Sequence, residues 1–225
     1  METVFIGAVV AAFGGALFVT GWEFFFSTDA KARRRLRKAA AGTIAEAHDG
    51  EVVKLVGTLH YVDRAPSIAP MSKRSCAAYE LQVEEKQSSG RSSSWVTVLS
   101  DKSCAAFWIE DASGKAFVDA VAPRVVVTMD AHRKSGFLND APRELERLLA
   151  SHGLSSEGWV FNKTLRYSEG VLEEGEAVAV LGRCHWELDP DPTASGVGYR
   201  DRPQRLVIRA PEPAEMLVTD EVRLL

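Results

Sequence analysis

Cysteine and histidine are the residues of this sequence best able to bind a metal or to act as a nucleophile with its base. Cys184 and His185 are adjacent in an apolar run. Neighbouring side chains on a strand point to opposite faces, so these two cannot readily serve one metal or one catalytic dyad. Cys76 and Cys104 form no Cys-x-x-Cys pair, the usual spacing of zinc ligands. The remaining histidines lie in unrelated contexts: His48, His60, His132 and His152. The sequence therefore predicts no metal site and no cofactor.

A serine-rich run offers hydroxyl groups that resemble a nucleophile-bearing loop. Residues 88–94 read SSGRSSS, without the Gly-x-Ser-x-Gly pattern of a nucleophile on a strand-to-helix turn. We interpret this run as the flexible tip of a hairpin. The sequence also contains no phosphate-binding loop, no His-Glu-x-x-His motif and no dinucleotide fingerprint. No catalytic residue is predicted.

The charge is divided unevenly along the chain, whose net charge is -4. The first 42 residues hold six basic side chains against three acidic ones, which leaves 21 basic and 28 acidic residues for the remainder. Phosphate binding needs a basic face, so this balance argues against nucleic acid as a partner of the remainder. The six basic residues form one cluster: Lys31, Arg33, Arg34, Arg35, Arg37 and Lys38.

Length and cysteine content set the class of protein. The 225 residues suit one anchor and one domain of about 180 residues. A domain of that size buries roughly 70% of the surface that its unfolded chain exposes, so it needs no disulfide or metal in order to fold. Three cysteines cannot all pair within one chain, and a reducing compartment is the simpler interpretation.

An uncharged stretch of 20 residues, Thr3 to Trp22, predicts a single transmembrane helix within residues 1–28. At 1.5 Å per residue it covers about 30 Å, the thickness of the hydrocarbon core of a bilayer. Residues 29–49, with the basic cluster, are expected to form a juxtamembrane helix or linker along anionic headgroups. The positive-inside rule then places the N-terminus outside the cell membrane and the domain, residues 50–225, in the cytoplasm.

Two alternatives concern this anchor. A cleaved signal peptide needs a positively charged start, where this chain has Glu2, and a shorter apolar core. Gly7, Ala11 and Gly15 recur every four residues and could form a face on which two helices pack into a homo-oligomer. Small residues are also simply common in membrane-spanning helices, so both interpretations of this face stay open.

The remainder reads as mainly β (α+β), an OB-like Greek-key barrel of five strands with one inserted helix. Asp111 and Gly114 stand between two β-rich runs and predict a hairpin, while Gly57 and Gly182 suit the bends of a barrel. The helix is expected over residues 140–153, with Leu145, Leu148 and Leu149 on one face. A β-sandwich or an open α+β sheet is the alternative fold. Strands are expected at 51–62, 76–86, 93–100, 105–111, 115–121, 124–129, 176–188 and 204–210.

Several segments in this order resemble one family. They are KLVGTLHYVD, SCAAYELQVEE, AFWIEDASGKAFVDAV, LRYSEGVLEEGEAVAVLGRC and LVIRAPEPAEMLVTD. Together they resemble the GIDE-type, or "beside a membrane" (BAM), domain, over roughly Val52 to Thr219. That domain occurs in mitochondrial membrane-anchored ubiquitin ligases and in prokaryotic membrane proteins. The ligases add a second span and a RING finger with paired cysteine and histidine ligands, which this sequence does not show after its last predicted strand.

The resemblance implies five candidate ligand-binding residues: Asp111, Gly114, Arg166, Tyr167 and Glu169. These could line a ligand groove, or they could form a hairpin turn and an Arg–Glu pair that braces one end of the barrel. Cys76 and Tyr79 match the second strand of the family, where a buried cysteine behaves as a small hydrophobic residue.

The resulting expectation is a non-enzymatic binding or scaffold module tethered at the inner membrane surface. Its partners would be membrane lipids, through the helix and its basic flank, and another membrane-associated protein. The competing class is a component of ubiquitin-type conjugation, which rests on family analogy alone. A membrane-apposed reader of nucleic acid is a third alternative, which would show salt-dependent binding.

Overall fold

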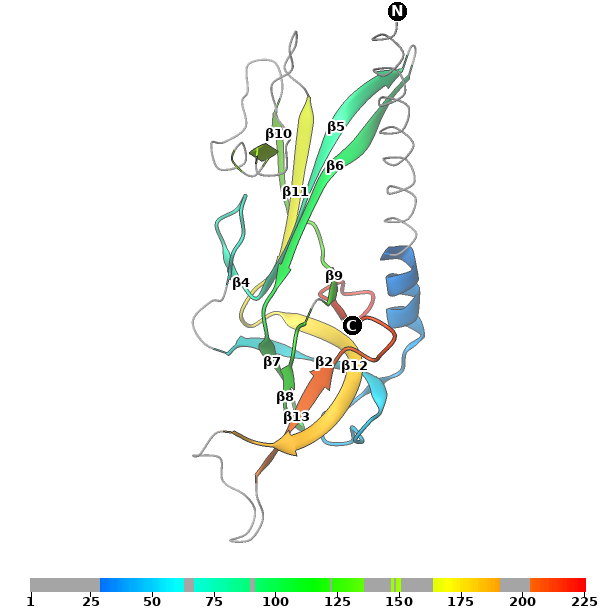
Figure 1. Ribbon diagram of the computed structural model, residues 1–225, viewed down its shortest axis with the longest axis vertical. Coiled ribbons are helices and arrows are strands. Elements are labelled where there is room, and N and C mark those ends of the chain that lie inside the picture. Colours follow the sequence, from blue (N-terminus) through cyan, green and yellow to red (C-terminus); the bar gives the residue numbers. More distant parts are fainter. Residues whose placement is uncertain are drawn as a thin grey trace, which may run out of the picture.

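The structure is a computed structural model in which two β-layers lie end to end (Figure 1). An eight-stranded sheet and a four-stranded sheet make up most of the fold, together with one two-stranded ribbon. The residues that the structure describes are mainly β, as predicted. The structure describes residues 29–62, 67–89, 92–121, 123–135, 147, 149–150, 164–190 and 203–225.

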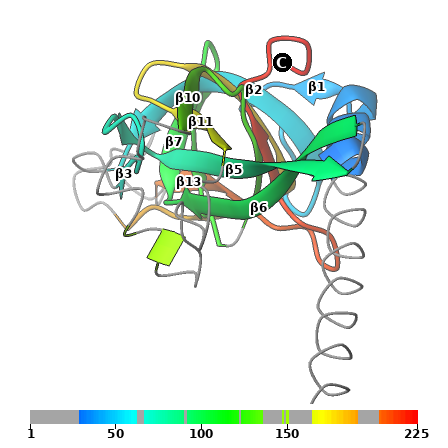
Figure 2. The same cartoon turned by 90° about the horizontal axis from the view of Figure 1, so that it is seen from above.

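Five strands of the larger sheet close into a barrel. The ring runs β2-β7-β8-β13-β12 and closes where β12 pairs with β2. Neighbouring strands are antiparallel except β8 and β13, which are parallel. Figure 2 looks down on this barrel, with the second sheet crossing in front of it. The barrel strands are β2 (Val52–Tyr61), β7 (Phe107–Asp111), β8 (Gly114–Val118), β12 (Ala177–Leu188) and β13 (Gln204–Arg209).

The barrel core follows the period-two alternation from which the strands were predicted. On β7, Phe107 and Ile109 are fully buried, whereas Trp108 between them is only partly buried. Leu55 and Leu59 of β2 lie in the same core cluster. The predicted hairpin is confirmed, because Asp111 pairs with Gly114 at the turn between β7 and β8.

The two barrel glycines named above serve a close approach of chains. A Cβ atom on Gly57 would lie 2.7 Å from the carbonyl oxygen of Glu110, and one on Gly182 would lie 2.4 Å from a methyl group of Ile208. Real Cβ atoms are not found at such distances. The missing side chain therefore lets neighbouring strands pack tightly.

Short segments extend the barrel sheet beyond the ring. Within the helix or linker expected over residues 29–49, only residues 29–38 are helical, and β1 then pairs in parallel with β2. A Cβ on Gly42 of β1 would lie 3.0 Å from Val53 of β2, and glycine is also a poor helix former. The added strands are β1 (Ala41–Gly42), β9 (Arg124–Val126) and β14 (Leu217–Thr219).

The second sheet is antiparallel, in the order β10-β11-β5-β6, and was not separated from the barrel in the prediction. The segments at 76–86 and 93–100 were assigned to one barrel, but they form the two longest strands of this sheet. Residues 88–94 belong largely to these strands, since Ser89 pairs with Ser92. The strands are β5 (Ala78–Ser89), β6 (Ser92–Cys104), β10 (Ala131–Ser135) and β11 (Leu165–Leu172), beside the ribbon of β3 (Ser67–Ile68) and β4 (Ser75–Cys76).

One face of the second sheet has its own core. Leu81 and Leu165 are buried there with Leu149. Residues 147, 149 and 150 have helical backbone, within the helix expected at 140–153. Leu145 and Leu148 lie outside the described residues. Each of the two layers thus has a hydrophobic cluster of its own, and the described residues form two smaller clusters as well.

No helix among the described residues is both long and apolar enough to cross a membrane. The span predicted within residues 1–28, and the packing face of Gly7, Ala11 and Gly15, lie outside those residues.

Candidate functional site

Glu169 is a buried carboxylate on β11, with none of its surface exposed. Its Oε1 accepts a hydrogen bond from the backbone N–H of Met71 at 2.7 Å, and its Oε2 accepts one from Ser72 at 2.8 Å. Both donors lie in the turn between β3 and β4. A buried carboxylate is tolerable only when such donors replace its water. Glu169 therefore fastens this turn to the second sheet.

Arg74 extends the polar contacts around this turn. Its Nη1 and Nη2 atoms each donate to Asp130 at 2.7 Å, and Nη1 also donates to Glu173 at 3.0 Å. The bidentate bond from Arg74 lowers the pKa of the Asp130 carboxyl. The turn is thus held both by the buried carboxylate of Glu169 and by the bidentate ion pair of Arg74 with Asp130.

Arg166 lies on the opposite side of β11 from the buried Tyr167. It forms a bidentate ion pair with Glu84 of β5, and its guanidinium stacks 4.7 Å from the ring centre of Trp95. The predicted Arg–Glu pair thus involves Glu84 instead of Glu169. It braces the second sheet, whereas the alternative prediction placed such a pair at one end of the barrel. Residues 165–172 form a strand that was not predicted.

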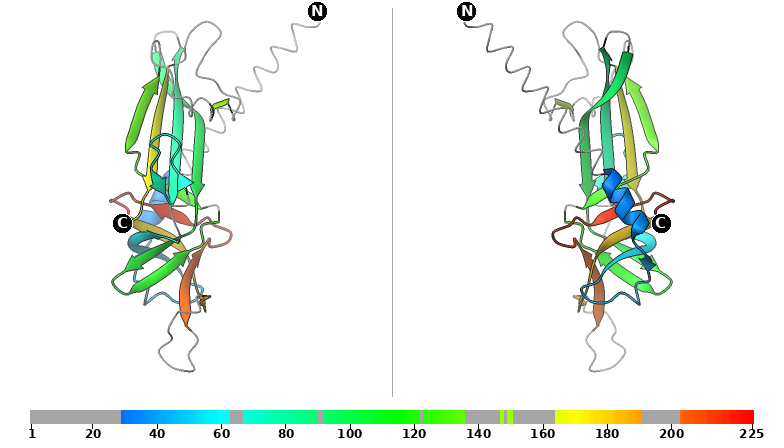
Figure 3. Two further views of the ribbon diagram at one scale, coloured as in Figure 1. Left: turned by 90° about the vertical axis from the view of Figure 1, so that its left-hand side faces the viewer. Right: turned by 90° about the vertical axis from the view of Figure 1, so that its right-hand side faces the viewer.

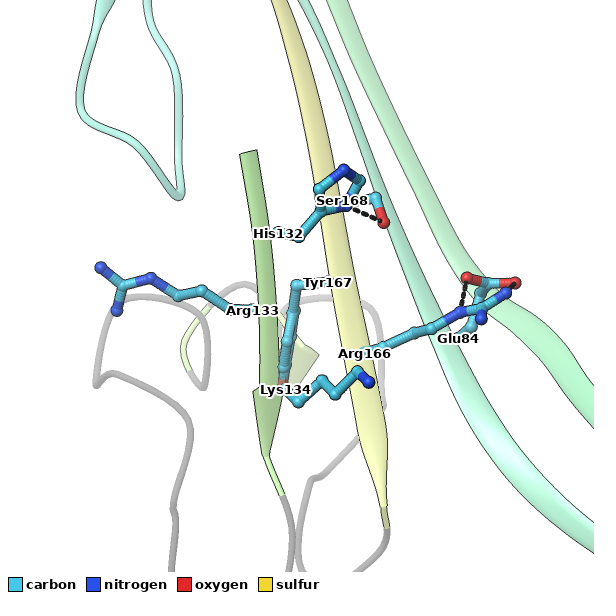
Figure 4. A pocket seen from close by; sticks show the side chains of 7 residues that line it. All are labelled: Glu84, His132, Arg133, Lys134, Arg166, Tyr167 and Ser168. Carbon is cyan, nitrogen blue, oxygen red and sulfur yellow. Dashed lines mark hydrogen bonds and ion pairs between the residues drawn. The ribbon is translucent and has the colours of Figure 1, made fainter. Parts of the chain in front are cut away.

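A hollow of about 330 Å³ opens over β10 and β11. Figure 4 shows Lys134 and Arg166 on one side of it, with Arg133 pointing away from both. His132 Nδ1 lies 3.1 Å from the Ser168 hydroxyl. The hollow is lined by Glu84, His132, Arg133, Lys134, Arg166, Tyr167 and Ser168.

The Ser168–His132 contact does not make a catalytic triad. Across the described residues, His132 contacts no carboxylate that would fix its tautomer and orientation, as nucleophilic catalysis requires. Both side chains are cross-strand neighbours in the register of β10 and β11. The hollow is a polar recess in which Glu84 already balances the charge of Arg166.

Asp111 and Gly114 lie at the barrel hairpin. Asp111 Oδ1 accepts hydrogen bonds from the N–H and hydroxyl of Ser113 and from the N–H of Gly114. Its Oδ2 accepts a hydrogen bond from the N–H of Ile44 at 2.9 Å. One carboxylate therefore closes its own turn and also fastens the segment that follows the helix at residues 29–38.

Folding stability should depend on pH through Asp111. Burial alone would raise the pKa of this carboxyl, but the bonds from Ser113, Ile44 and Gly114 outweigh burial and lower it. A carboxyl with a lowered pKa adds stability above its unfolded pKa of about 4, and that stability is lost as the pH falls through the folded pKa. We expect Asp111→Asn to flatten the loss of stability below pH ~4. Urea unfolding over an acid pH series measures this, and an unchanged pH profile in the variant would contradict it.

The five candidate residues occupy two separate places. Asp111 and Gly114 serve the barrel hairpin and the segment at Ile44, whereas the other three share β11. Tyr167 and Glu169 are buried. Only Arg166 and Tyr167 line the hollow. The arrangement gives each carboxylate a structural partner, and a ligand groove uniting all five is not formed.

The three cysteines behave as small hydrophobic residues and not as reactive thiols. Burial raises the pKa of Cys76 and Cys184 to about 11 and that of Cys104 to about 12. Cys184 lies inside the barrel, while His185 is partly exposed and faces Asp49. Among the described residues, no group of three or more His, Cys, Asp or Glu side chains is placed to hold a metal ion.

These thiols should resist alkylation in the folded protein. Because the thiolate is the nucleophile, a raised thiol pKa leaves little reactive form near neutral pH. We expect negligible labelling by iodoacetamide at pH ~8 under native conditions, and labelling at all three positions in denaturant. Mass spectrometry counts the adducts. Rapid native labelling of Cys104 would refute the assignment.

Sequence analysis named Arg33 only as part of the basic cluster and did not predict the ion pairs that hold the helix at residues 29–38. Arg124 Nη1 donates to Asp29 Oδ1 at 3.2 Å, and Arg124 Nε donates to Glu215 at 2.6 Å. Arg33 Nε donates to Glu221 at 2.8 Å. Two of the acidic partners, Glu215 and Glu221, come from the last 11 residues of the chain. A charge pattern cannot show such pairing, because the partners are distant in sequence.

Comparison with protein-family models, curated proteins and solved structures found no match. The resemblance of the ordered segments to the GIDE-type domain stays a prediction.

Proposed function

We propose that this protein is a non-enzymatic binding or scaffold module, anchored in the cell membrane by a single span within residues 1–28 and exposed on the cytoplasmic side. Its partners would be membrane lipids and another membrane-associated protein. The observation that carries the proposal is the helix at residues 29–38, which is fixed against the barrel and begins seven residues after the end of the uncharged stretch.

Both apolar and ionic contacts fix this helix. Ala32 and Leu36 are buried, and ion pairs at Asp29 and Arg33 join the helix to Arg124 and Glu221. Figure 3, right, shows the helix beside the C-terminal segment. The apolar neighbours of Ala32 and Leu36 are Val126, Leu181, Leu217 and Leu224. A docked helix cannot act as a loose tether.

Chain length then limits how far the barrel can be from a bilayer. Seven residue steps separate Trp22, the end of the uncharged stretch, from Asp29. Even fully extended, they span at most about 25 Å. A span ending at Trp22 would therefore hold the module within that distance of the membrane surface, and tethering raises its effective concentration for partners in the same membrane.

The barrel itself is proposed to be of the OB type. What supports this is the ring order, in which the first, second and third barrel strands form a meander and the fifth returns in parallel beside the third. The helical residues 147 and 149–150 fall between the third and fourth barrel strands. Such Greek-key barrels are used as binding modules in many unrelated proteins, so fold alone assigns no ligand.

Membrane fractionation of the full chain tests the anchor. The wild-type protein should stay with membranes through carbonate and high-salt washing, and added protease should digest the domain only in inside-out vesicles. Val9→Arg combined with Ala12→Arg should release it, because each arginine at the centre of a span costs about 3 kcal/mol. Val9→Leu with Ala12→Leu is the matched control and should remain bound. A soluble wild-type chain would overturn the proposal.

The non-enzymatic part has its own test. The purified full chain should form no conjugates when it is mixed with a ubiquitin-charged carrier enzyme. Conjugate formation would replace the scaffold assignment with the ligase-type alternative.

A further inference from the structure

The helix at residues 29–38 presents four of its six cations on the side away from the barrel. Lys31, Arg34, Arg37 and Lys38 are all exposed. At 3.6 residues per turn they fall on one side of the helix, opposite the side that carries Ala32 and Leu36. The helix therefore packs one face on the barrel and exposes an opposite face that carries four cations.

These four cations have no partner in the part of the chain that the structure describes. Arg33, by contrast, pairs with Glu221, and the nearby Arg124 pairs with Asp29 and Glu215. Asp29, Glu215 and Glu221 are therefore already paired with Arg33 and Arg124. The outer face, here called the cationic face (Lys31, Arg34, Arg37 and Lys38), keeps four unbalanced charges on a module that is otherwise acidic.

An anionic bilayer is the occupant that fits this face. The chain leaves the described part at Asp29 toward an uncharged stretch of membrane-spanning length, so a bilayer would lie close to the cationic face. Basic clusters beside a span are attracted to anionic lipid headgroups. Nucleic acid fits less well, because the rest of the module carries 28 acidic against 21 basic residues.

We propose that the cationic face rests on anionic headgroups and lays the module along the membrane with its long axis in the membrane plane. Figures 1 and 3 show the helix running roughly along the long axis of the molecule, beside the barrel. In Figure 2, the helix lies on one side of the barrel and β3 on the other. This orientation turns the β3–β4 ribbon toward the cytoplasm, where a partner can reach it.

The inference rests on the proposed membrane anchor and names its lipid partner. It is tested with the full chain in nanodiscs of phosphatidylcholine alone, or of phosphatidylcholine mixed with phosphatidylglycerol. A fluorophore is placed at Ala45→Cys, seven residues after the helix, or at Ile68→Cys in β3, and a quencher is attached to lipid headgroups. Cys76 and Cys184 are buried and Cys104 is partly buried, and the raised pKa of all three thiols should keep them unlabelled.

We expect strong quenching at position 45 and weak quenching at position 68 in the anionic discs, and loss of this contrast in the neutral discs. Replacing Lys31, Arg34, Arg37 and Lys38 by glutamine should also abolish it, because each charge near an anionic surface changes the ratio of apposed to lifted molecules about fivefold. The matched control removes the same charge from exposed positions elsewhere: Lys73, Lys86, Arg133 and Arg147. It should keep the contrast.

The inference would be overturned, with the anchor intact, if the quenching contrast between positions 45 and 68 were equal in neutral and anionic discs. The same would follow if the variant of the cationic face and its control variant lost the contrast equally. Failure of the wild-type chain to co-elute with any disc would instead overturn the anchor itself. The two failures are therefore distinguishable.

Discussion

Replacing Glu169 by alanine is expected to lower the free energy of unfolding by about 3 kcal/mol. The substitution leaves the backbone N–H groups of Met71 and Ser72 without their acceptor, at 2.7 and 2.8 Å in the native protein. The hydrogen bond from the N–H of Met71 is buried, so water does not readily replace Glu169 as its acceptor. Urea unfolding measures the loss, and amide exchange at residues 71 and 72 should accelerate more than exchange within the barrel.

Glu169→Gln is the matched control for size. It keeps one acceptor oxygen for one of the two donors but turns an N–H group toward the other. Its cost should therefore lie between those of the wild type and the alanine variant. An alanine variant as stable as the wild type would show that this carboxylate does not hold the turn.

The barrel strands could be predicted because their signal is local. Alternation along β7 places Phe107 and Ile109 inside, and the Asp111–Gly114 turn closes the hairpin, all within eight residues. The same alternation in β5 and β6 identifies strands but does not say which sheet they join. Partner choice depends on contacts between distant segments, so the second sheet was not separated from the barrel.

β11 shows why part of the site was not predictable. Its inward positions include Tyr167 and Glu169, and a charged residue on a buried face breaks the apolar–polar pattern that marks a strand. Glu169 is acceptable there only because of donors 98 and 97 residues away. The local pattern of apolar and polar residues in one sequence cannot show a partner so distant along the chain.

The basic cluster illustrates the opposite case, in which composition was informative but incomplete. Its run of arginines predicted a surface for headgroups, yet Arg33 proves to be paired with Glu221. Only the helix geometry divides the cluster into cations that hold the barrel and cations that face outward. Leu36 and Ala32 are the buried residues that mark the side of the helix facing the barrel.

Leu36→Ala should release the helix from the barrel. The side chain is fully buried, and truncating a buried leucine costs about 3 kcal/mol, from lost burial and the cavity left behind. That cost falls on the contact between the helix and the barrel, since its neighbours are Leu181, Leu217 and Leu224. We expect trypsin to cut at Arg34 and Arg35 much faster in the variant, because cleavage within a docked helix requires local opening.

Leu188→Ala removes the same atoms from an exposed position, 54% accessible, and is the matched control. It should leave trypsin sensitivity unchanged. If Leu36→Ala is cut no faster than this control, the ion pairs at Asp29 and Arg33 hold the helix alone, and apolar packing does not fix its orientation. If it is cut faster while the barrel amides keep their protection, the helix is a separable arm whose docking sets how the module meets the bilayer.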